Sequence, residues 1–146
     1  MSGKILVISL VGFSFAFGFF VYYFQVFSYY SKVEGLDYIF VDGKKINVEQ
    51  YYGLDSSISG LKLRGCFKVN IEDFKTFKKY KKATPLQAPF WFNCFDNEKI
   101  QKSLENNDAS AFLAEENELD GIDRIVAIYS DGRGYQWRQL NSKYME

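Results

Sequence analysis

A long run of uncharged residues near the N-terminus is the feature that most limits which structures this chain can form. No residue in the range 5–31 is charged, and Lys4 and Lys32 flank the run. A membrane-spanning helix needs roughly 20 mostly apolar residues at about 1.5 Å each, and helices in globular cores rarely stay uncharged for so long. Several tyrosines lie toward the C-terminal end of the run, where their amphipathic rings suit the lipid headgroup layer. The run therefore predicts a transmembrane anchor within residues 1–32.

A cleaved signal peptide is the competing interpretation of the same run. Its apolar centre would be shorter and would end in small residues, whereas here tyrosine, phenylalanine and glutamine follow. We therefore expect a retained, single-pass anchor. Lys4 and the terminal amine precede the span, and Lys32 is soon followed by Glu34 and Asp37. By the positive-inside rule this small bias favours a cytoplasmic N-terminus and an extracytoplasmic domain of residues 33–146.

Small residues recur inside the predicted span at a spacing of four. Gly12 and Ala16 form one such pair, and Ser14 and Gly18 form another. Small side chains at this spacing let a second helix approach closely, so Gly12 and Ala16 are candidate helix-packing residues. The plainer interpretation is that glycine and serine are common in spanning helices.

Composition excludes several classes of function. The chain has 18 Lys+Arg and 18 Asp+Glu, so it lacks the basic excess that nucleic-acid binding requires. It contains no histidine, which removes His-ligated metal and haem sites and His-dependent catalysis. Its two cysteines are too few for a four-cysteine zinc site or an iron–sulfur cluster. We expect no cofactor and no enzymatic activity.

Periodicity in the remainder predicts an α+β domain, a small antiparallel sheet with one or two helices. Asp42-Gly43 suits a hairpin turn that needs positive φ, and a second turn follows at 130–134. Asn70 and Asp96 are candidate N-caps of two helices. The expected strands are 37–41, 44–48, 61–69, 111–114, 122–129 and 135–140, the expected helices are 71–80 and 97–106, and Pro85 and Pro89 mark a loop.

The two cysteines, Cys66 and Cys94, are a candidate disulfide. Such a bond is permitted if the domain lies outside the cytoplasm, and it would contribute roughly 3–4 kcal/mol in the chain-entropy model. The alternative is two buried thiols that act as small apolar residues. In the alternating strand 61–69, Cys66 shares the face of Arg64 and Lys68, opposite Leu63 and Phe67. That placement counts against simple burial of Cys66.

One strong charge run stands out in the domain. It consists of Lys75, Lys78, Lys79, Lys81 and Lys82, interleaved with Phe74, Phe77 and Tyr80. A lysine-rich surface can bind anionic lipid headgroups or an acidic partner. The alternative is an amphipathic helix whose polar side happens to be rich in lysine.

Other motifs favour plain structural interpretations. Residues 60–65 have the glycine spacing of a phosphate loop, but Cys66 and Phe67 replace the lysine and hydroxyl that should follow. Arg133 at the tip of the 130–134 turn is a weak candidate for binding a carboxylate, and we expect this segment to serve as a turn. The acidic stretch lacks calcium-loop spacing and is expected to be a solvated face; it contains Glu115, Glu116, Glu118, Asp120 and Asp123.

Three stretches carry a resemblance to a known family. They are Leu63-Arg-Gly-Cys-Phe67, residues 85–96 (PLQAPFWFNCFD) and residues 121–141 (GIDRIVAIYSDGRGYQWRQLN). The chain resembles, over nearly its whole length, a family of small bacterial single-span proteins of unknown function, some labelled histidine kinase. That label finds no support in a chain without histidine. The resemblance implies a bacterial inner-membrane protein with a periplasmic domain, and it implies that Cys66 and Cys94 belong to the family pattern.

Three classes of function remain as expectations. The first is a non-catalytic accessory subunit or assembly factor of an integral membrane complex, for example a respiratory one, in contact with the lipid bilayer. The second is an anchored ligand-binding or sensor module, which would need a roomy pocket. The third is an enzyme, which the missing histidine and motifs make the weakest.

Overall fold

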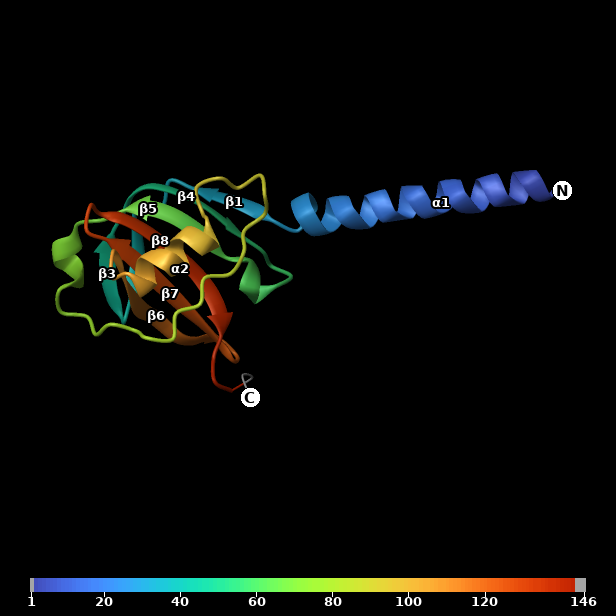
Figure 1. The fold of residues 1–146 in the computed structure, drawn as a ribbon. Coiled ribbons are helices and arrows are strands. Elements are labelled where there is room, and N and C mark those ends of the chain that lie inside the picture. The colour runs from blue at the N-terminus through green and yellow to red at the C-terminus, as the bar shows by residue number, and fades with distance from the viewer. Residues whose placement is uncertain (1, 144–146) are drawn as a thin grey trace. The chain divides into compact units, whose positions relative to one another are not determined.

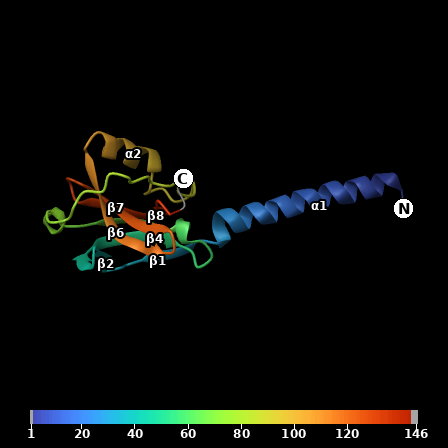
Figure 2. The same ribbon diagram turned by 90° about the horizontal axis from the view of Figure 1, so that it is seen from below.

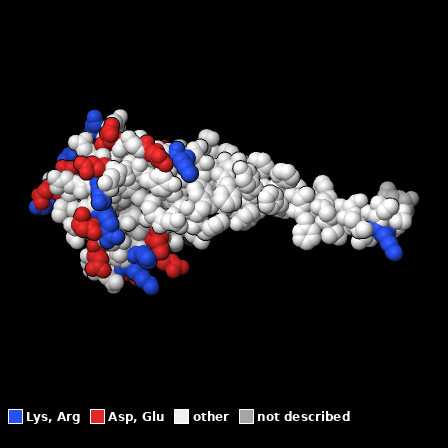
Figure 3. Space-filling model, turned by 90° about the horizontal axis from the view of Figure 1, so that it is seen from above, with Lys and Arg blue, Asp and Glu red and all other residues white. Residues whose placement is uncertain are grey.

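The computed structural model describes residues 2–143, and the chain divides into two compact units with the boundary between Tyr30 and Ser31. The first unit is helix α1 (Gly3–Tyr23), capped by the Ser2 side chain and continued by a π-helical turn, Phe24–Ser28. Charged groups are absent along this helix beyond its N-terminal lysine (Figure 3). The segment Gly3–Ser28 is long and apolar enough to span a membrane, as the uncharged run predicted.

The second unit is an antiparallel α+β domain, which confirms the predicted fold class (Figure 1). A six-stranded sheet has the order β1-β4-β5-β8-β7-β6, and β2 and β3 form a separate two-stranded sheet. One α-helix, α2 (Asn97–Glu105), begins after Asp96, whose carboxylate accepts from the backbone of Glu98 and Lys99. The strands are β1 (Ser31–Glu34), β2 (Tyr38–Val41), β3 (Lys44–Asn47), β4 (Glu49–Asp55), β5 (Arg64–Lys68), β6 (Ala109–Leu119), β7 (Ile122–Tyr129) and β8 (Arg133–Leu140).

The β2–β3 hairpin covers one face of the large sheet. Asp42 and Gly43 both have positive φ in its turn, as the Asp-Gly pair predicted. Every second residue of β2 points inward, so Ile39 and Val41 are buried while their neighbours are exposed. They share one apolar core with Phe67, Phe112 and Val126 of the sheet below. Burial of these side chains fixes the hairpin against the sheet.

Helix α2 and the loop of residues 83–96 cover the opposite face. Figure 2 shows α2 on one side of the sheet and β2 on the other. Ile100 of α2, Phe92 and Phe95 of the loop and Trp137 of β8 are all buried. The alternation in 61–69 correctly placed Leu63 and Phe67 in the core, but on the opposite face only Lys68 is exposed. Arg64 is only 4% exposed, because the loop lies over it.

The helix predicted for 71–80 is wrong beyond its first turn. A 3₁₀ turn spans Ile71–Phe74, and an extended segment follows. There Lys79 pairs with Phe112, and the Tyr80 N–H donates to the Ala111 carbonyl at 2.7 Å. The open edge of β6 offers backbone partners to this segment, which competes with helix formation.

The ends of several strands differ from the expected positions, and backbone pairing between strands explains most of the differences. Strand β6 is longer than the apolar segment 111–114, because its polar half pairs with β7 through two register shifts. Strand β5 starts at Arg64, since Gly60–Lys62 form a 3₁₀ turn instead. Strands β1 and β4 were not predicted. They pair with each other at the sheet edge, where burial alternates weakly.

Candidate functional site

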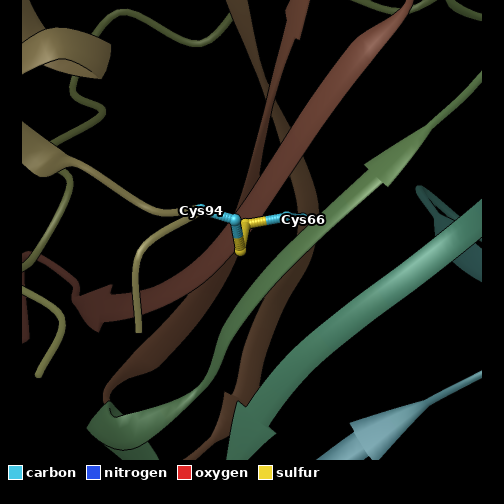
Figure 4. The surroundings of a disulfide bond; sticks show 2 residues. All are labelled: Cys66 and Cys94. Atoms are coloured by element: carbon cyan, nitrogen blue, oxygen red, sulfur yellow. A yellow bond between two sulfur atoms is a disulfide. The ribbon is translucent and has the colours of Figure 1, made fainter. Parts of the chain in front are cut away.

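Cys66 and Cys94 form a disulfide in this structure, with Cα atoms 6.3 Å apart. Figure 4 shows the bond joining strand β5 to the loop that carries Cys94. The same loop is held by Arg64, which donates to the carbonyls of Leu86 at 3.2 Å and Gln87 at 2.9 Å. Cys94 is exposed and Cys66 is half-buried, so the two side chains are not the buried apolar residues of the alternative interpretation. The bond therefore fixes the cover of one sheet face.

The lysine cluster does not lie on an amphipathic helix: Lys75 ends the 3₁₀ turn, and the other lysines follow it in the segment that pairs with β6. Lys75 pairs with Glu72 at 2.7 Å. Lys78, Lys79, Lys81 and Lys82 are exposed. Lysines along a sheet edge discourage edge-to-edge aggregation, which gives the cluster a structural role besides any binding role.

An aromatic pair is exposed on the outer face of the β2–β3 hairpin. Tyr38 is 44% exposed and Phe40 is 49% exposed, and their rings meet edge to face with centroids 5.5 Å apart. The ammonium of Lys45 lies 4.3 Å from the Tyr38 ring centroid. Aromatic side chains are enriched in protein–protein contact surfaces, and the cation–π contact of Lys45 holds the Tyr38 ring in place. We call Tyr38, Phe40 and Lys45 the hairpin patch.

A buried polar network lies between the hairpin and the large sheet. Arg124 of β7 is 7% exposed and donates to Glu118 at 2.8 Å, to Gln136 at 3.0 Å and to the Phe40 carbonyl at 2.7 Å. Gln136 in turn donates to the Tyr51 hydroxyl at 2.6 Å. Glu118 also accepts from Arg138 at 2.8 Å. The network satisfies each of these buried groups and holds the hairpin in place.

Burial and charge shift two pKa values in this network. Burial alone would raise the pKa of Glu118, but the hydrogen bonds and charges of Arg138 and Arg124 outweigh it and hold that pKa below its ordinary value. Burial raises the pKa of Tyr51, so its hydroxyl stays neutral. The network therefore contains two guanidinium cations around one carboxylate and is structural in character.

A polar groove of about 510 Å³ opens where β6, β7 and the chain after β8 meet the lysine segment. Asp123 is its most buried acidic residue, at 4% exposure. The carboxylate Oδ1 accepts from the Asn117 N–H at 2.8 Å and from Asn141 Nδ2 at 3.1 Å. We call this the Asp123 groove. Its lining includes Tyr80, Lys81, Lys82, Glu116, Asp123 and Asn141.

The acidic stretch is therefore not a uniform solvated face. Glu115, Glu116 and Asp120 are exposed as expected, whereas Glu118 is paired in the network and Asp123 is buried. No group of three or more Cys, Asp and Glu side chains within residues 2–143 is arranged to hold a metal ion. Arg133 at the turn donates to Asp131 at 2.8 Å and lies over Tyr129, so its own turn engages it.

The candidate helix-packing residues lie on a helix without buried residues. Every described residue of α1 is exposed, and a Cβ added at Gly12 would meet no atom within 4 Å beyond its chain neighbours and the backbone of its own helix. The surface around Gly12 and Ala16 is thus open along its length. Near the C-terminal end of the apolar segment, the rings of Tyr22 and Tyr23 each pack against Phe27, with centroids 6.3 and 5.8 Å apart.

The Asp123 groove and the hairpin patch were missed by sequence reasoning for a physical reason. The groove gathers residues near positions 80, 116, 123 and 141, which only the sheet register brings together. The alternation of Tyr38 and Phe40 with Ile39 and Val41 was the one local signal for the patch.

Comparison with known proteins identifies the family of this chain. Residues 39–145 match DUF6446, a family of unknown function, and the chain belongs to it. No curated protein and no solved structure matches the chain.

Proposed function

We propose that this DUF6446 protein is a non-catalytic, single-pass accessory subunit or assembly factor of an integral membrane complex, such as a respiratory one. In this proposal α1 lies in the bacterial inner membrane and the disulfide-bonded domain lies in the periplasm. The apolar helix supports the membrane location, and the Cys66–Cys94 bond supports an oxidising compartment.

The hairpin patch is the observation that carries the proposal. Tyr38 and Phe40 leave about half of their surface in solvent although an apolar core lies directly beneath them. Their backbone is held in place, since Arg124 binds the Phe40 carbonyl. Large aromatic side chains on a rigid strand bury much area at a small entropic cost, which is why aromatic residues are enriched in interfaces. A protein partner that covers the patch would use them as anchors.

The span offers a second contact to the same partner. Gly12 and Ala16 present little side-chain bulk on one side of α1. In a bilayer, helix association depends on close backbone approach, which small residues permit. Contacts by both the helix and the domain would restrict the chain to an integral membrane partner.

Co-purification after mild solubilisation tests the proposal. The tagged full chain is expected to retain a stoichiometric integral membrane partner. A variant carrying Tyr38→Ser and Phe40→Ser should lose it while the domain stays folded. Phe90→Ser is the matched control, because Phe90 is 71% exposed on the loop across the sheet. Recovery of no partner, or equal retention by all three chains, contradicts the proposal.

A membrane-anchored ligand-binding or sensor module is the second candidate. The Asp123 groove favours it, because a buried carboxylate at the base of a polar groove is a feature of small-molecule sites. A chain that binds a small molecule and retains no protein partner would support this candidate over the first.

A further inference from the structure

We infer that the Asp123 groove binds a small zwitterion in which a primary ammonium is linked to a phosphate, the chemistry of phosphoethanolamine. Two sources share this chemistry: the soluble compound and the headgroup of phosphatidylethanolamine. The inference rests on the second candidate function and does not depend on the accessory-subunit proposal.

Asp123 supplies the acceptor for the ammonium. Every fully buried side-chain nitrogen or oxygen within residues 2–143 has a hydrogen-bond partner. Both hydrogen bonds to Asp123 end on Oδ1, and Oδ2 accepts none within those residues. Oδ2 must therefore be accessible from the groove, although the residue is 4% exposed. A largely buried carboxylate with one unpaired oxygen is poorly solvated and would gain from a charged donor.

The carboxylate is held in place before any ligand binds. Asn117 has φ of 49° at a register shift in β6, and its N–H points to Asp123. The side chain of Asn141 binds both Asn117, at 2.6 Å, and Asp123. Strained backbone at a bulge beside a groove is a recurrent feature of binding sites. The site thus needs little rearrangement to accept a donor.

An organic ammonium fits this acceptor better than a metal ion. Hard cations take six or more oxygen ligands from several carboxylates and carbonyls, and no metal-binding group of acidic side chains occurs within residues 2–143. Tyr80 lines the same groove close to Asp123 and Glu116; burial and these two carboxylates raise its pKa. The neutral hydroxyl and ring of Tyr80 therefore lie beside two carboxylates, a setting suited to an ammonium.

Lys81 and Lys82 supply the opposite charge. Both are exposed on the groove wall, and neither forms an ion pair within residues 2–143. They would repel a simple amine, so a ligand bound to Asp123 must also carry an anionic group. Two lysines suit an anionic phosphate, which carries about −1.5 to −2 as the monoester of the soluble compound and a single negative charge as the diester of the lipid headgroup.

The experiment uses the full chain in phosphatidylcholine nanodiscs, with phosphoethanolamine added to the solution. The NMR signals of the Asn117 amide and the Asn141 side-chain amide report on the site, because both groups donate to Asp123. We expect saturable shifts of these signals. Ethanolamine alone and inorganic phosphate alone should each bind at least about tenfold more weakly, because each engages only one of the two charges.

Matched variants localise the binding. Asp123→Asn keeps an oxygen for Asn117 but replaces Oδ2, and it should weaken binding at least about tenfold. Glu115→Gln is its control, since Glu115 is exposed on β6 and does not line the groove. The double variant of Lys81→Gln and Lys82→Gln should weaken binding to a similar extent, whereas Lys75→Gln with Lys78→Gln should not. If Asp123→Asn fails to fold, the lysine pairs still test the inference.

Nanodiscs that contain phosphatidylethanolamine distinguish the two sources. Shifts of the same signals without added ligand identify the headgroup, and shifts only with the soluble compound identify the free zwitterion. The inference is overturned if Asp123→Asn binds phosphoethanolamine as tightly as the wild type does, or if glycine binds more tightly than phosphoethanolamine. It is also overturned if the signals shift neither with the soluble compound nor in the nanodiscs that contain phosphatidylethanolamine. Partner retention by Asp123→Asn is measured separately, so failure here leaves the accessory-subunit proposal unaffected.

Discussion

The guanidinium of Arg124 in β7 donates a hydrogen bond of 2.7 Å to the carbonyl of Phe40 in β2, across 84 residues of sequence. This bond joins the hairpin to the large sheet from below. The outward side chain of Phe40 is therefore presented on a fixed backbone, and the hairpin patch depends on a buried cation.

Replacing Arg124 with methionine should destabilise the domain by about 3–5 kcal/mol, because Glu118, Gln136 and the Phe40 carbonyl each lose a buried donor. Urea unfolding of the full chain in detergent, followed by tryptophan fluorescence, measures the change. Arg133→Met is the control: the Arg133 side chain is half exposed and pairs with Asp131 and the Tyr129 ring at the surface, so its loss should cost about 1 kcal/mol or less. Equal effects of the two substitutions would contradict a structural role for the network.

Glu118 should make stability depend on pH in the acid range. Arg138 and Arg124 hold its pKa below the ordinary value of 4.5. A carboxylate with a depressed pKa stabilises the folded state fully above its unfolded pKa, and this contribution is lost as pH falls through the folded pKa. The stability difference between the wild type and Glu118→Gln should thus be constant from pH 7 to about 5 and shrink below about 4.5. Unfolding of both chains at several pH values measures it, and a difference that stays constant down to about pH 3 would contradict the prediction.

Local patterns predicted the α+β class, the hairpin at Asp42-Gly43 and the helix after Asp96, because turn and cap chemistry involves neighbouring residues. The same reasoning gave a wrong prediction for residues 71–80, where a helix was expected. The threefold spacing of Phe74, Phe77 and Tyr80 suited a helix, but pairing with β6 decided the outcome.

The burial of the candidate site residues depends even more on contacts with residues that are distant in the sequence. Arg64 and Lys68 alternate with core residues as on a solvent face, yet only Lys68 is exposed, because a loop some 20 residues later covers Arg64. Asp123 likewise sits in an acidic stretch whose composition indicated solvent. Its burial depends on Asn117 and Asn141, and their approach follows from strand register.

Reducing the Cys66–Cys94 bond should lower stability by about 3–4 kcal/mol, since the bond closes a loop over a sequence separation of 28. The double variant Cys66→Ala with Cys94→Ala should behave like the reduced protein. Mass spectrometry after alkylation, with and without prior reduction, measures the redox state of the chain from native membranes. Alkylation without reduction would show free thiols and remove one support for a periplasmic domain.

The domain should lie outside the cytoplasm. Lys4 stands before the span and the bias across it is small, so the orientation needs a direct measurement. A reporter enzyme that is active only outside the cytoplasm, fused after residue 146, should be active. The same fusion to a reporter that works only in the cytoplasm should be inactive, and the reverse result would invert the proposed topology.

Bulky side chains on one side of α1 should release the partner. Gly12→Leu with Ala16→Leu adds two side chains where a neighbouring helix would approach, and close packing would be lost. Ser14→Leu with Gly18→Leu adds comparable bulk about 200° around the helix, since successive residues are about 100° apart. Co-purification should fall for the first pair and persist for the second, while the disulfide forms normally in both. Equal loss in both would indicate a general defect of the span, and retention in both would remove Gly12 and Ala16 from the contact.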